Sequence, residues 1–381
     1  MLKKILCMIM VISILCNSFV FANTSLELKS KAAILMDANT GKILYENNSH
    51  EKRHPASVTK VMTILLIMEA IDSGKISMED RVTCSENASN MGGSQIWLDT
   101  RETLSVHEML KAICVVSAND CCVAMAEHIA GSEAEFVNMM NAKAKELGMN
   151  DTNFVNCHGL DEDTHLTSAH DIALMSRELI TKHPRVFDYT TIWMDSLRDG
   201  KSELVNTNKL LRTYKGANGL KTGSTSLALF NLSATAKRDN LQLIGVIMGG
   251  ATSKERNNDA AKLLDYGFAN FVSLELDKKD SVLSEVKVSK GEKDKVNAVL
   301  QNDMFALIKK GDDKNVEKEI ILDENLMAPL QKGAKAGEVV YRIKGEVVGR
   351  ENLVLSEDVG KITIAKSFSK IMLNWVKVGR E

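Results

Sequence analysis

The 381-residue sequence predicts a layered α/β or α+β domain, followed by a small all-β domain and a terminal amphipathic helix. Strand-like segments open and close the part up to residue 274 and enclose a long helical region, which is typical of a sheet packed with helices. From residue 275 to residue 357, short segments alternate between apolar and polar side chains, as half-buried strands do. From residue 358 onward, apolar residues recur at helical spacing.

The composition indicates a globular protein and excludes several classes of binding partner and cofactor. Hydrophobic residues make up 44% of the chain and charged residues 26%, as in globular proteins with a sizeable core. The formal net charge of −2 gives no general attraction to polyanions, so we expect no nucleic-acid partner. Of the 7 cysteines, Cys7 and Cys16 lie in the leader, and the others are odd in number and lack the spacing of metal ligands. We expect no required disulfide framework, no metal site and no cofactor.

Residues 1–22 are typical of a cleaved signal peptide. Lys3 and Lys4 precede an apolar run over residues 5–15, and a small-residue cleavage site ends at Ala22. The alternative is a membrane-spanning anchor, but the apolar run is shorter than the roughly 20 residues that such a helix needs. We therefore expect export.

The first domain is expected over residues 23–274. The turn sequence at 37–41 lies between two apolar runs and predicts a hairpin over residues 32–45. Apolar side chains at helical spacing predict the helices that follow, and breakers such as Gly148 mark their ends. The helices are expected from residue 57, over 106–128 with an interruption at 117–120, and over 133–147, 168–181 and 256–271; a glycine-rich turn at 216–223 runs into a strand, and a second strand covers 241–248.

A charged, helix-poor stretch at 273–280 marks the start of the small all-β domain, expected over 275–357. Its strands are expected at 281–288, 317–322, 338–343 and 346–348. In the terminal helix over 358–381, one face carries Ile364, Phe368, Ile371, Met372, Trp375 and Val378, and the other carries Lys366, Lys370 and Lys377. A basic amphipathic helix of this kind can lie in a membrane interface, and packing against its own domain is the alternative.

Ser57 and Lys60 lie three residues apart at the start of an apolar run. In a helix, residues i and i+3 share one face, so the Lys60 amine can stand beside the Ser57 hydroxyl. Backbone N–H groups at a helix N-terminus also favour negative charge that develops on a substrate oxygen. The pair predicts a nucleophile with its own base, although Ser-x-x-Lys alone is too short to be specific.

Two further motifs follow the Ser-x-x-Lys pair. They are Ser-Ala-Asn at 117–119 and Lys-Thr-Gly at 221–223. A Ser/Asn pair by itself more commonly caps a helix. The ordered set of S-x-x-K, S-x-N and K-T-G, however, is the signature of penicillin-binding proteins and serine β-lactamases, and it favours acyl transfer.

With these motifs, the chain resembles the serine-type D-alanyl-D-alanine carboxypeptidases, the low-molecular-mass penicillin-binding proteins, over essentially its whole mature length. Similar stretches also occur at 117–120, 128–132, 147–149, 156–160 and 263–268. The resemblance implies a domain of the serine β-lactamase and transpeptidase type, with an antiparallel sheet flanked by helices. It also implies a carboxy-terminal β domain. Members of the family often end in a helix that binds the membrane surface, so the resemblance favours such a helix here.

The activity implied by the resemblance is removal of the terminal D-alanine from peptidoglycan stem peptides during cell-wall maturation, outside the cytoplasmic membrane. Ser57 would form an acyl-enzyme, and β-lactam antibiotics would acylate the same serine. Lys60 can act as the base if burial and neighbouring cations lower its pKa. The resemblance assigns to Ser117 a proton relay to the departing amine and to Asn119 a hydrogen bond to the substrate backbone.

The third motif is expected to bind the substrate. On an edge strand, Lys221, Thr222 and Gly223 can pair with an extended peptide, and glycine lets the two backbones come close. The lysine keeps the local potential positive, and the Thr222 hydroxyl can bind a terminal carboxylate. The backbone N–H groups of Ser57 and Ser224 are the expected donors to the oxyanion.

The resemblance also places Arg256 near the terminal carboxylate and His158 at the edge of the site. A surface arginine that starts a helix and a structural loop histidine are the alternatives for these two residues. The chain departs from the usual family pattern at Thr100 and Arg101, where Pro-Gly is common, and at Leu229, where a small or polar residue is common.

Two other functions fit the same motifs. A serine β-lactamase needs a deacylating glutamate between the second and third motifs. Asp161, Glu162 and Asp163 occupy the comparable stretch without the expected Glu-x-x-Leu-Asn context. A catalytically silent penicillin-binding scaffold is the other alternative, and the three intact motifs argue against it.

Overall fold

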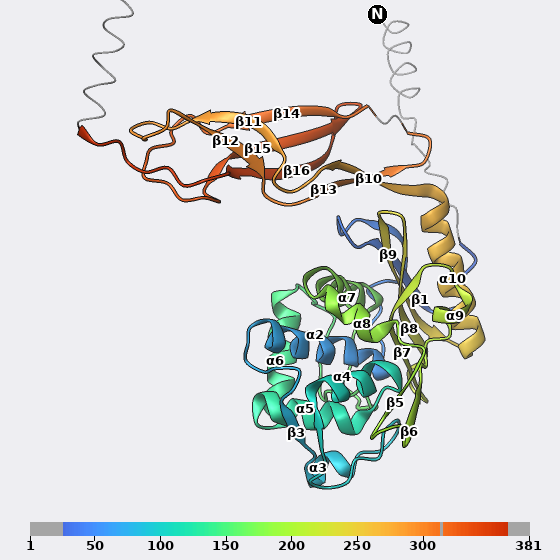
Figure 1. Cartoon of the computed structure of the whole chain (residues 1–381). Helices are drawn as coiled ribbons and strands as arrows, with labels where there is room; N and C mark the ends of the chain where they lie inside the picture. The colour runs from blue at the N-terminus through green and yellow to red at the C-terminus, as the bar shows by residue number, and fades with distance from the viewer. Residues whose placement is uncertain (1–25, 313–314, 365–381) are drawn as a thin grey trace, which may run out of the picture.

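The computed structural model describes residues 26–312 and 315–364, and a five-stranded antiparallel sheet forms the centre of its first part (Figure 1). The predicted hairpin forms one side of this sheet, and its first strand pairs with the last strand of the domain. The strand that carries the third motif lies at the opposite edge, so one of its sides is free. In spatial order, the strands are β2 (Ile43–Asn47), β1 (Ala32–Asp37), β9 (Leu241–Gly250), β8 (Leu229–Arg238) and β7 (Ala217–Thr225).

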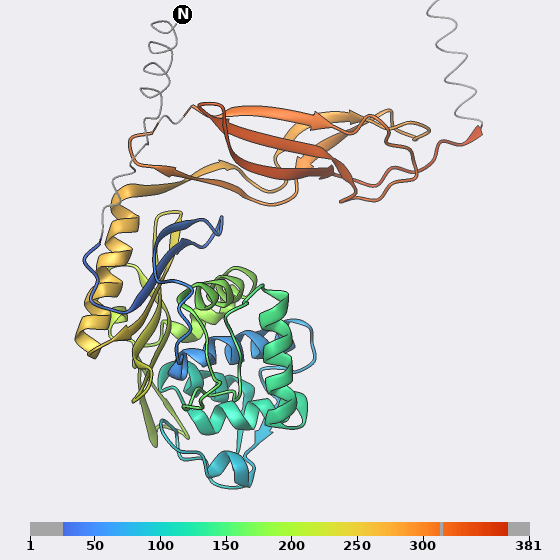
Figure 2. The same ribbon diagram turned by 180° about the vertical axis from the view of Figure 1, so that it is seen from behind.

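Helices cover both faces of the sheet (Figures 1 and 2). The closing helix α10 (Ser253–Asn270) packs against β8 and β9 on one face, in an apolar cluster that also includes Leu210. The other face carries a helical layer with the larger core. Its longer members are α2 (Lys60–Asp72), α4 (Val106–Val115), α5 (Asn119–Ala130), α6 (Glu133–Glu146) and α7 (Ala169–Lys182).

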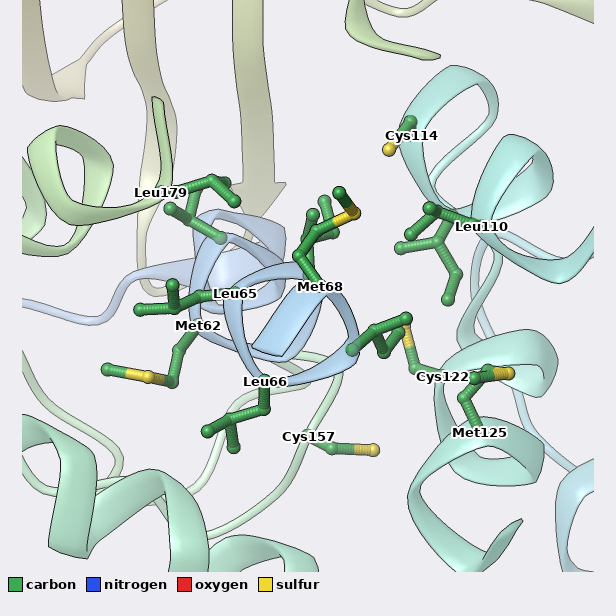
Figure 3. Close-up of a cluster of buried hydrophobic side chains, with 14 of the residues drawn as sticks. Met62, Leu65, Leu66, Met68, Leu110, Cys114, Cys122, Met125, Cys157 and Leu179 are labelled. Atoms are coloured by element: carbon green, nitrogen blue, oxygen red, sulfur yellow. The ribbon is translucent and has the colours of Figure 1, made fainter. Parts of the chain in front are cut away.

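Helix α2 runs through the middle of this layer. Its side chains point outward on all sides and meet residues of the surrounding helices α4, α5 and α7 (Figure 3). A helix that is apolar all round has no face for solvent, and burying each Leu or Met side chain stabilises the fold by about 1.5–3 kcal/mol. Because Lys60 is the first residue of α2, its backbone is fixed within the core.

Side-chain caps mark the starts of four of the predicted helices, and α10 begins at Ser253, three residues before its expected start. Ser105 forms a capping box with Glu108 at the start of α4, and Ser132, Ser168 and Thr252 cap α6, α7 and α10. No side chain caps α5 or α2, and a 3-10 turn, η1 (Ala56–Thr59), leads into α2. The Ser57 hydroxyl is therefore not used as a cap.

Several strands were not expected. The segment at 216–223 is not a glycine-rich turn for most of its length, because β7 begins at Ala217. Strand β8 was missed because its centre is buried on both faces, with small polar side chains such as Ser233 and Thr235 turned inward. The short hairpin of β5 (Met194–Leu197) and β6 (Ser202–Val205) was also missed. The remaining short elements are β3 (Arg81–Thr83), α3 (Glu86–Ser89), β4 (Thr103–Ser105), η2 (Pro184–Val186), α8 (Phe187–Thr190) and α9 (Leu210–Thr213).

The second part of the chain is all β and has a separate core. Strand β10 (Phe271–Asp277) continues directly from α10, crosses the expected boundary at 274 and pairs with β13 (Met304–Lys309) (Figure 1). A five-stranded antiparallel sheet forms the rest. Its order is β11 (Val282–Lys287), β12 (Lys295–Leu300), β16 (Glu346–Leu355), β15 (Lys335–Ile343) and β14 (Glu317–Leu322).

The expected terminal segments are largely outside the described residues. Val359 and Lys361, which the sequence assigned to the terminal helix, instead bridge to Leu330 and Gly291 of the β part. The rest of that helix, over 365–381, and the leader over 1–22 lie outside the described residues. Within residues 26–312 and 315–364, no helix combines the length and apolar character needed to cross a membrane.

We expect Arg101→Gly to stabilise the fold. Arg101, where the resemblance implies a glycine, has φ 72, a left-handed conformation that costs an L-residue about 1 kcal/mol. Relief of this strain should raise the thermal midpoint by about 1–3 °C. Thr100→Gly is the matched control, because Thr100 is not in the left-handed region and gains nothing from glycine. Equal shifts in the two variants, measured by differential scanning calorimetry, would contradict the strain account.

Candidate active site

The three motifs meet at one cleft of about 210 Å³ between the free edge of β7 and the helical layer. Most of the residues proposed from the sequence either line this cleft or lie directly behind it. The lining residues are Ser57, Ser94, Ser117, Thr207, Thr222, Gly223, Ser224, Phe230, Ser253 and Arg256. Lys60, Asn119 and Lys221 are buried behind the surface of the cleft.

The turn that carries Ser57 is held between two glycines. A Cβ atom at Gly159 would lie 1.9 Å from the carbonyl oxygen of Ala56, and one at Gly223 would lie 2.9 Å from the Ser57 nitrogen. Neither position can hold a side chain, so β7 and the loop at 159 approach the turn at backbone distance. Asn231 on β8 adds a support by donating to the carbonyls of His54 and Pro55 at 2.9 and 3.1 Å. The nucleophile is therefore fixed relative to the edge strand.

The Lys60 amine is fully buried and has three hydrogen-bond partners. Its Nζ lies 3.0 Å from Ser57 Oγ, 2.6 Å from Asn119 Oδ1 and 2.6 Å from the carbonyl oxygen of His158. Burial lowers the pKa of Lys60 below its usual 10.5, because the charged form loses its hydration. The arrangement predicted from the i, i+3 spacing is confirmed: the amine stands beside the hydroxyl.

The amide of Asn119 is oriented by the loop before α4. Its Nδ2 donates to the carbonyl of Gly92 at 2.7 Å, and its backbone N–H donates to the carbonyl of Ser94 at 2.7 Å. With Nδ2 on a carbonyl, Oδ1 is left to face Lys60. Both polar atoms of the side chain are engaged in this way. The role expected for Asn119 toward the substrate backbone stays a prediction.

Asp120 is a further organising residue that the sequence analysis did not single out. Its buried carboxylate accepts the backbone N–H groups of Ile96 and Leu98, each at 3.1 Å. Burial raises the pKa of this carboxyl, and the backbone donors oppose the shift. Asp120 thereby ties the loop at 92–98 to the start of α5. An acidic residue directly after the Ser-Ala-Asn motif was the signal available in the sequence.

Ser117 has a strained backbone and an unused hydroxyl. Its φ is 66, in the left-handed region that residues other than glycine rarely adopt. Its Oγ is buried and has no hydrogen-bond partner among the described residues. Strain and an unsatisfied polar atom are both costly, and their coincidence at a cleft is typical of a functional group that awaits a ligand.

Lys221 and Thr222 point in opposite directions from β7. Lys221 is buried, and burial followed by the charge of Lys60 lowers its pKa to about 7. Its Nζ donates to the carbonyl of Thr222 at 2.8 Å. The Thr222 hydroxyl faces the cleft and lies 2.7 Å from the hydroxyl of Thr207. The motif therefore supplies a cation behind the cleft and a hydroxyl within it.

Arg256 adds a second cation at the cleft. It is only 4% exposed, and burial lowers its pKa to about 10. Its guanidinium donates to Ser253 Oγ at 3.0 Å and to Asn257 Oδ1 at 2.9 Å. Across residues 26–312 and 315–364, no carboxylate forms an ion pair with it. The cleft is thus suited to an anionic group.

His158 takes part through its backbone rather than its side chain. Its carbonyl binds Lys60, whereas its ring is buried and its Nδ1 accepts the backbone N–H of Leu160 at 3.2 Å. Burial, followed by the charge of Lys60, lowers the pKa of the ring to about 3, so the imidazole is neutral. The ring does not line the cleft.

Four lining residues were not proposed from the sequence: Ser94, Thr207, Phe230 and Ser253. They come from two loops, a strand and the start of α10, far apart in the chain, and none belongs to a recognised motif. The pair Asn206 and Asn208, which flanks Thr207, was the one local sign of an ordered loop.

Comparison with known proteins matches both parts of the chain. Residues 19–252 match the family model described as D-alanyl-D-alanine carboxypeptidase, and residues 271–361 match the C-terminal domain of penicillin-binding protein 5. The chain is 44% identical over 353 residues to the D-alanyl-D-alanine carboxypeptidase DacF of Bacillus subtilis, which covers 92% of this chain and 90% of that protein.

Solved structures show the same architecture. Penicillin-binding protein 5 from Haemophilus influenzae aligns with a TM-score of 0.75 and 36% identity, over 89% of this chain and 99% of that chain. Penicillin-binding protein D2 from Listeria monocytogenes, in its ampicillin-bound form, aligns with a TM-score of 0.59 and 32% identity, over 64% of this chain and 99% of that chain. The predicted fold class is confirmed for both the peptidase part and the carboxy-terminal β part.

We expect Gly223→Ala to slow acylation of Ser57 by about 100-fold, because a shift of about 1 Å between reacting groups has an effect of this size. The new Cβ would lie 2.8 Å from the Val58 nitrogen and would push β7 away from the turn. The rate is measured by labelling with a fluorescent penicillin. Gly245→Ala in β9 is the control, because its Cβ would meet Leu263 at an ordinary 3.5 Å. Wild-type labelling of folded Gly223→Ala would contradict the proposed close approach.

Proposed function

The chain belongs to the D-alanyl-D-alanine carboxypeptidase family and is a serine-type carboxypeptidase that acts on the cell wall, and we propose that Ser57 is its nucleophile and Lys60 its general base. The partners of the Lys60 amine carry this proposal. A neutral amine has two N–H groups and one lone pair. Asn119 Oδ1 and the carbonyl of His158 can only accept, so they take both N–H groups. The lone pair is left to accept the Ser57 O–H.

Acylation follows from this arrangement. Ser57 Oγ attacks the carbonyl carbon of the penultimate D-alanine while its proton passes to Lys60 Nζ. The backbone N–H groups of Ser57 and Ser224 are the proposed donors to the oxyanion. The C–N bond to the terminal D-alanine then breaks, and the departing amine receives the proton through Ser117, whose hydroxyl has no competing partner among the described residues. Water, deprotonated by the same base, hydrolyses the acyl ester and restores Ser57.

Substrate binding is proposed to use the edge strand and the cations. The peptide stem extends along the free edge of β7, where backbone pairing is available. Thr222 and Arg256 hold the terminal carboxylate, and Lys221 contributes positive potential from behind. Ampicillin bound to the Listeria relative supports the further inference that β-lactams acylate Ser57 in this chain.

Localisation is part of the proposal. The leader over residues 1–22 directs export, and the terminal segment holds the enzyme on the outer face of the cytoplasmic membrane through its amphipathic pattern. The stem peptides of the cell wall are then within reach of the cleft.

Intact-mass analysis of residues 23–381 tests the proposed residues. Incubation with a pentapeptide ending in D-Ala-D-Ala should release D-alanine, and penicillin should leave a slowly lost adduct on Ser57. Ser57→Ala should do neither. Absence of D-alanine release, or an adduct that persists in Ser57→Ala, would overturn the assignment.

The acylation rate is predicted to rise with pH and to level off below pH 10.5, the usual pKa of a lysine. Because burial lowers the pKa of Lys60, this lysine is fully deprotonated at a lower pH than an ordinary lysine. Below its pKa, the acylation rate increases by up to about tenfold per pH unit. Lys60→Arg should lose labelling throughout, because a guanidinium keeps its proton. Labelling rates between pH 5 and pH 10 measure the profile. A wild-type rate that still climbs tenfold per unit near pH 10 would contradict a lowered pKa.

Truncation after Thr363 is predicted to move the protein from the membrane fraction to the soluble fraction. This end point keeps Val359 and Lys361, which bridge to the β part, and removes only the remainder of the amphipathic segment. Activity on a soluble pentapeptide should not change. Full-length protein with Trp375→Glu, which places a charge on the apolar face, should also leave the membrane. Unchanged partitioning of both variants would rule out the anchor.

A further inference from the structure

Thr207 lines the cleft next to Thr222, the threonine of the third motif. Its Oγ1 is 2.7 Å from Oγ1 of Thr222. Both threonines line the cleft together with Arg256. Thr222 is 7% exposed, whereas Thr207 is exposed, so a ligand in the cleft can reach the Thr207 side chain directly. The loop from 206 to 208 thus completes a wall of the cleft that Arg256 also lines.

Two buried asparagines fix this loop. Asn206 donates from Nδ2 to the carbonyl of Ile192 at 2.8 Å, and its Oδ1 accepts the backbone N–H of Asn208 at 2.8 Å. Asn208 donates from Nδ2 to the carbonyl of Gly219 in β7 at 2.8 Å. The position of Thr207 is therefore set by direct bonds to the strand that carries the third motif. A side chain held in this way keeps its geometry when a ligand binds.

The same loop is also bonded to the helical wall of the cleft. The backbone N–H of Thr207 donates to the carbonyl of Val115 at 3.2 Å. Val115 ends α4 and precedes the Ser-Ala-Asn motif by two residues. The loop that carries Thr207 is thus hydrogen-bonded to both walls of the cleft, the edge strand and the helical layer.

The two hydroxyl groups of Thr207 and Thr222 leave one O–H free to donate a hydrogen bond to a ligand. Each hydroxyl has one O–H, and only one of the two donates in the bond between them. The other O–H stays available to a ligand. Arg256, which has no carboxylate partner among the described residues, favours an anion at the same place. The pair therefore presents one donor to an anion in a cleft that also holds a guanidinium, and loss of the Thr207 hydroxyl removes the bond that orients Thr222.

We propose that Thr207 is a specificity-determining residue that, paired with Thr222 in the cleft that Arg256 also lines, binds the free terminal carboxylate of the substrate. This inference rests on the proposed function and adds a residue to its carboxylate subsite. Substrates with a carboxylate on the leaving group accept a hydrogen bond from the hydroxyl pair and bind more tightly. Substrates whose leaving group is neutral do not, because no anion reaches the donor.

The test compares wild type, Thr207→Val and Thr207→Ser on two matched acyl-D-alanine thioesters. The leaving group is thioglycolate in one and its neutral methyl ester in the other, and a D-Ala-D-Ala pentapeptide is the third substrate. For Thr207→Val, kcat/KM should fall about tenfold with the pentapeptide and the thioglycolate, mainly through KM, because one hydrogen bond to a charged group is lost. With the neutral ester, it should change by less than about twofold. Thr207→Ser keeps the hydroxyl and should stay close to wild type.

The outcomes separate this inference from the proposed function. Equal losses of Thr207→Val on the charged and neutral thioesters would mean a structural role and overturn the inference, as would an unchanged Thr207→Val. A loss in Thr207→Ser as large as that in Thr207→Val would also overturn it, and this comparison remains informative if the valine variant folds poorly. Failure of the wild type to release D-alanine from the pentapeptide would instead contradict the proposed function.

Discussion

A buried amine without an ion pair is the constraint on which the cleft depends. Across the described ranges, no carboxylate forms an ion pair with Lys60, and an isolated buried ammonium costs several kcal/mol. A neutral amine avoids that cost if acceptors take its two N–H groups. The carbonyl of His158 and the amide oxygen of Asn119 supply these acceptors, and α2 holds the lysine backbone in the core. The structure around Lys60 thereby favours its free-base form.

The same constraint explains the charge of the cleft. Lys221 and Arg256 are also buried, and both have lowered pKa values, about 7 and about 10. The charge of Lys60 is one cause of the shift at Lys221, so the two lysines disfavour each other's protonated form. Negative charge is scarce among the residues that line the cleft, which include one arginine and no carboxylate. A substrate that ends in a carboxylate compensates this positive potential, whereas a neutral end leaves it unpaired.

The parts of the site that could be predicted from the sequence are those that local spacing determines. Ser57 and Lys60 share a face across the junction of a 3-10 turn and a helix, as an i, i+3 pair does. The starts of α4, α6 and α7 were also predicted to within one residue, and so was the edge position of β7. Contacts between distant segments could not be predicted from one sequence. The bond of Asn119 to Gly92, the pairing of Thr207 with Thr222 and the use of the His158 carbonyl depend on the packed fold.

The most direct measurement is an NMR titration of the Lys60 side chain in the apo-enzyme. Protein with 13C-labelled lysine at Cε is followed from pH 5 to pH 11, and Lys60→Met identifies the resonance. The account predicts that the Lys60 signal changes below pH 10.5, the usual pKa, because burial without an ion-pair partner disfavours the charged form. A Lys60 signal that titrates near pH 10.5, with the surface lysines, would contradict the claim that the fold prepares a neutral base beside Ser57.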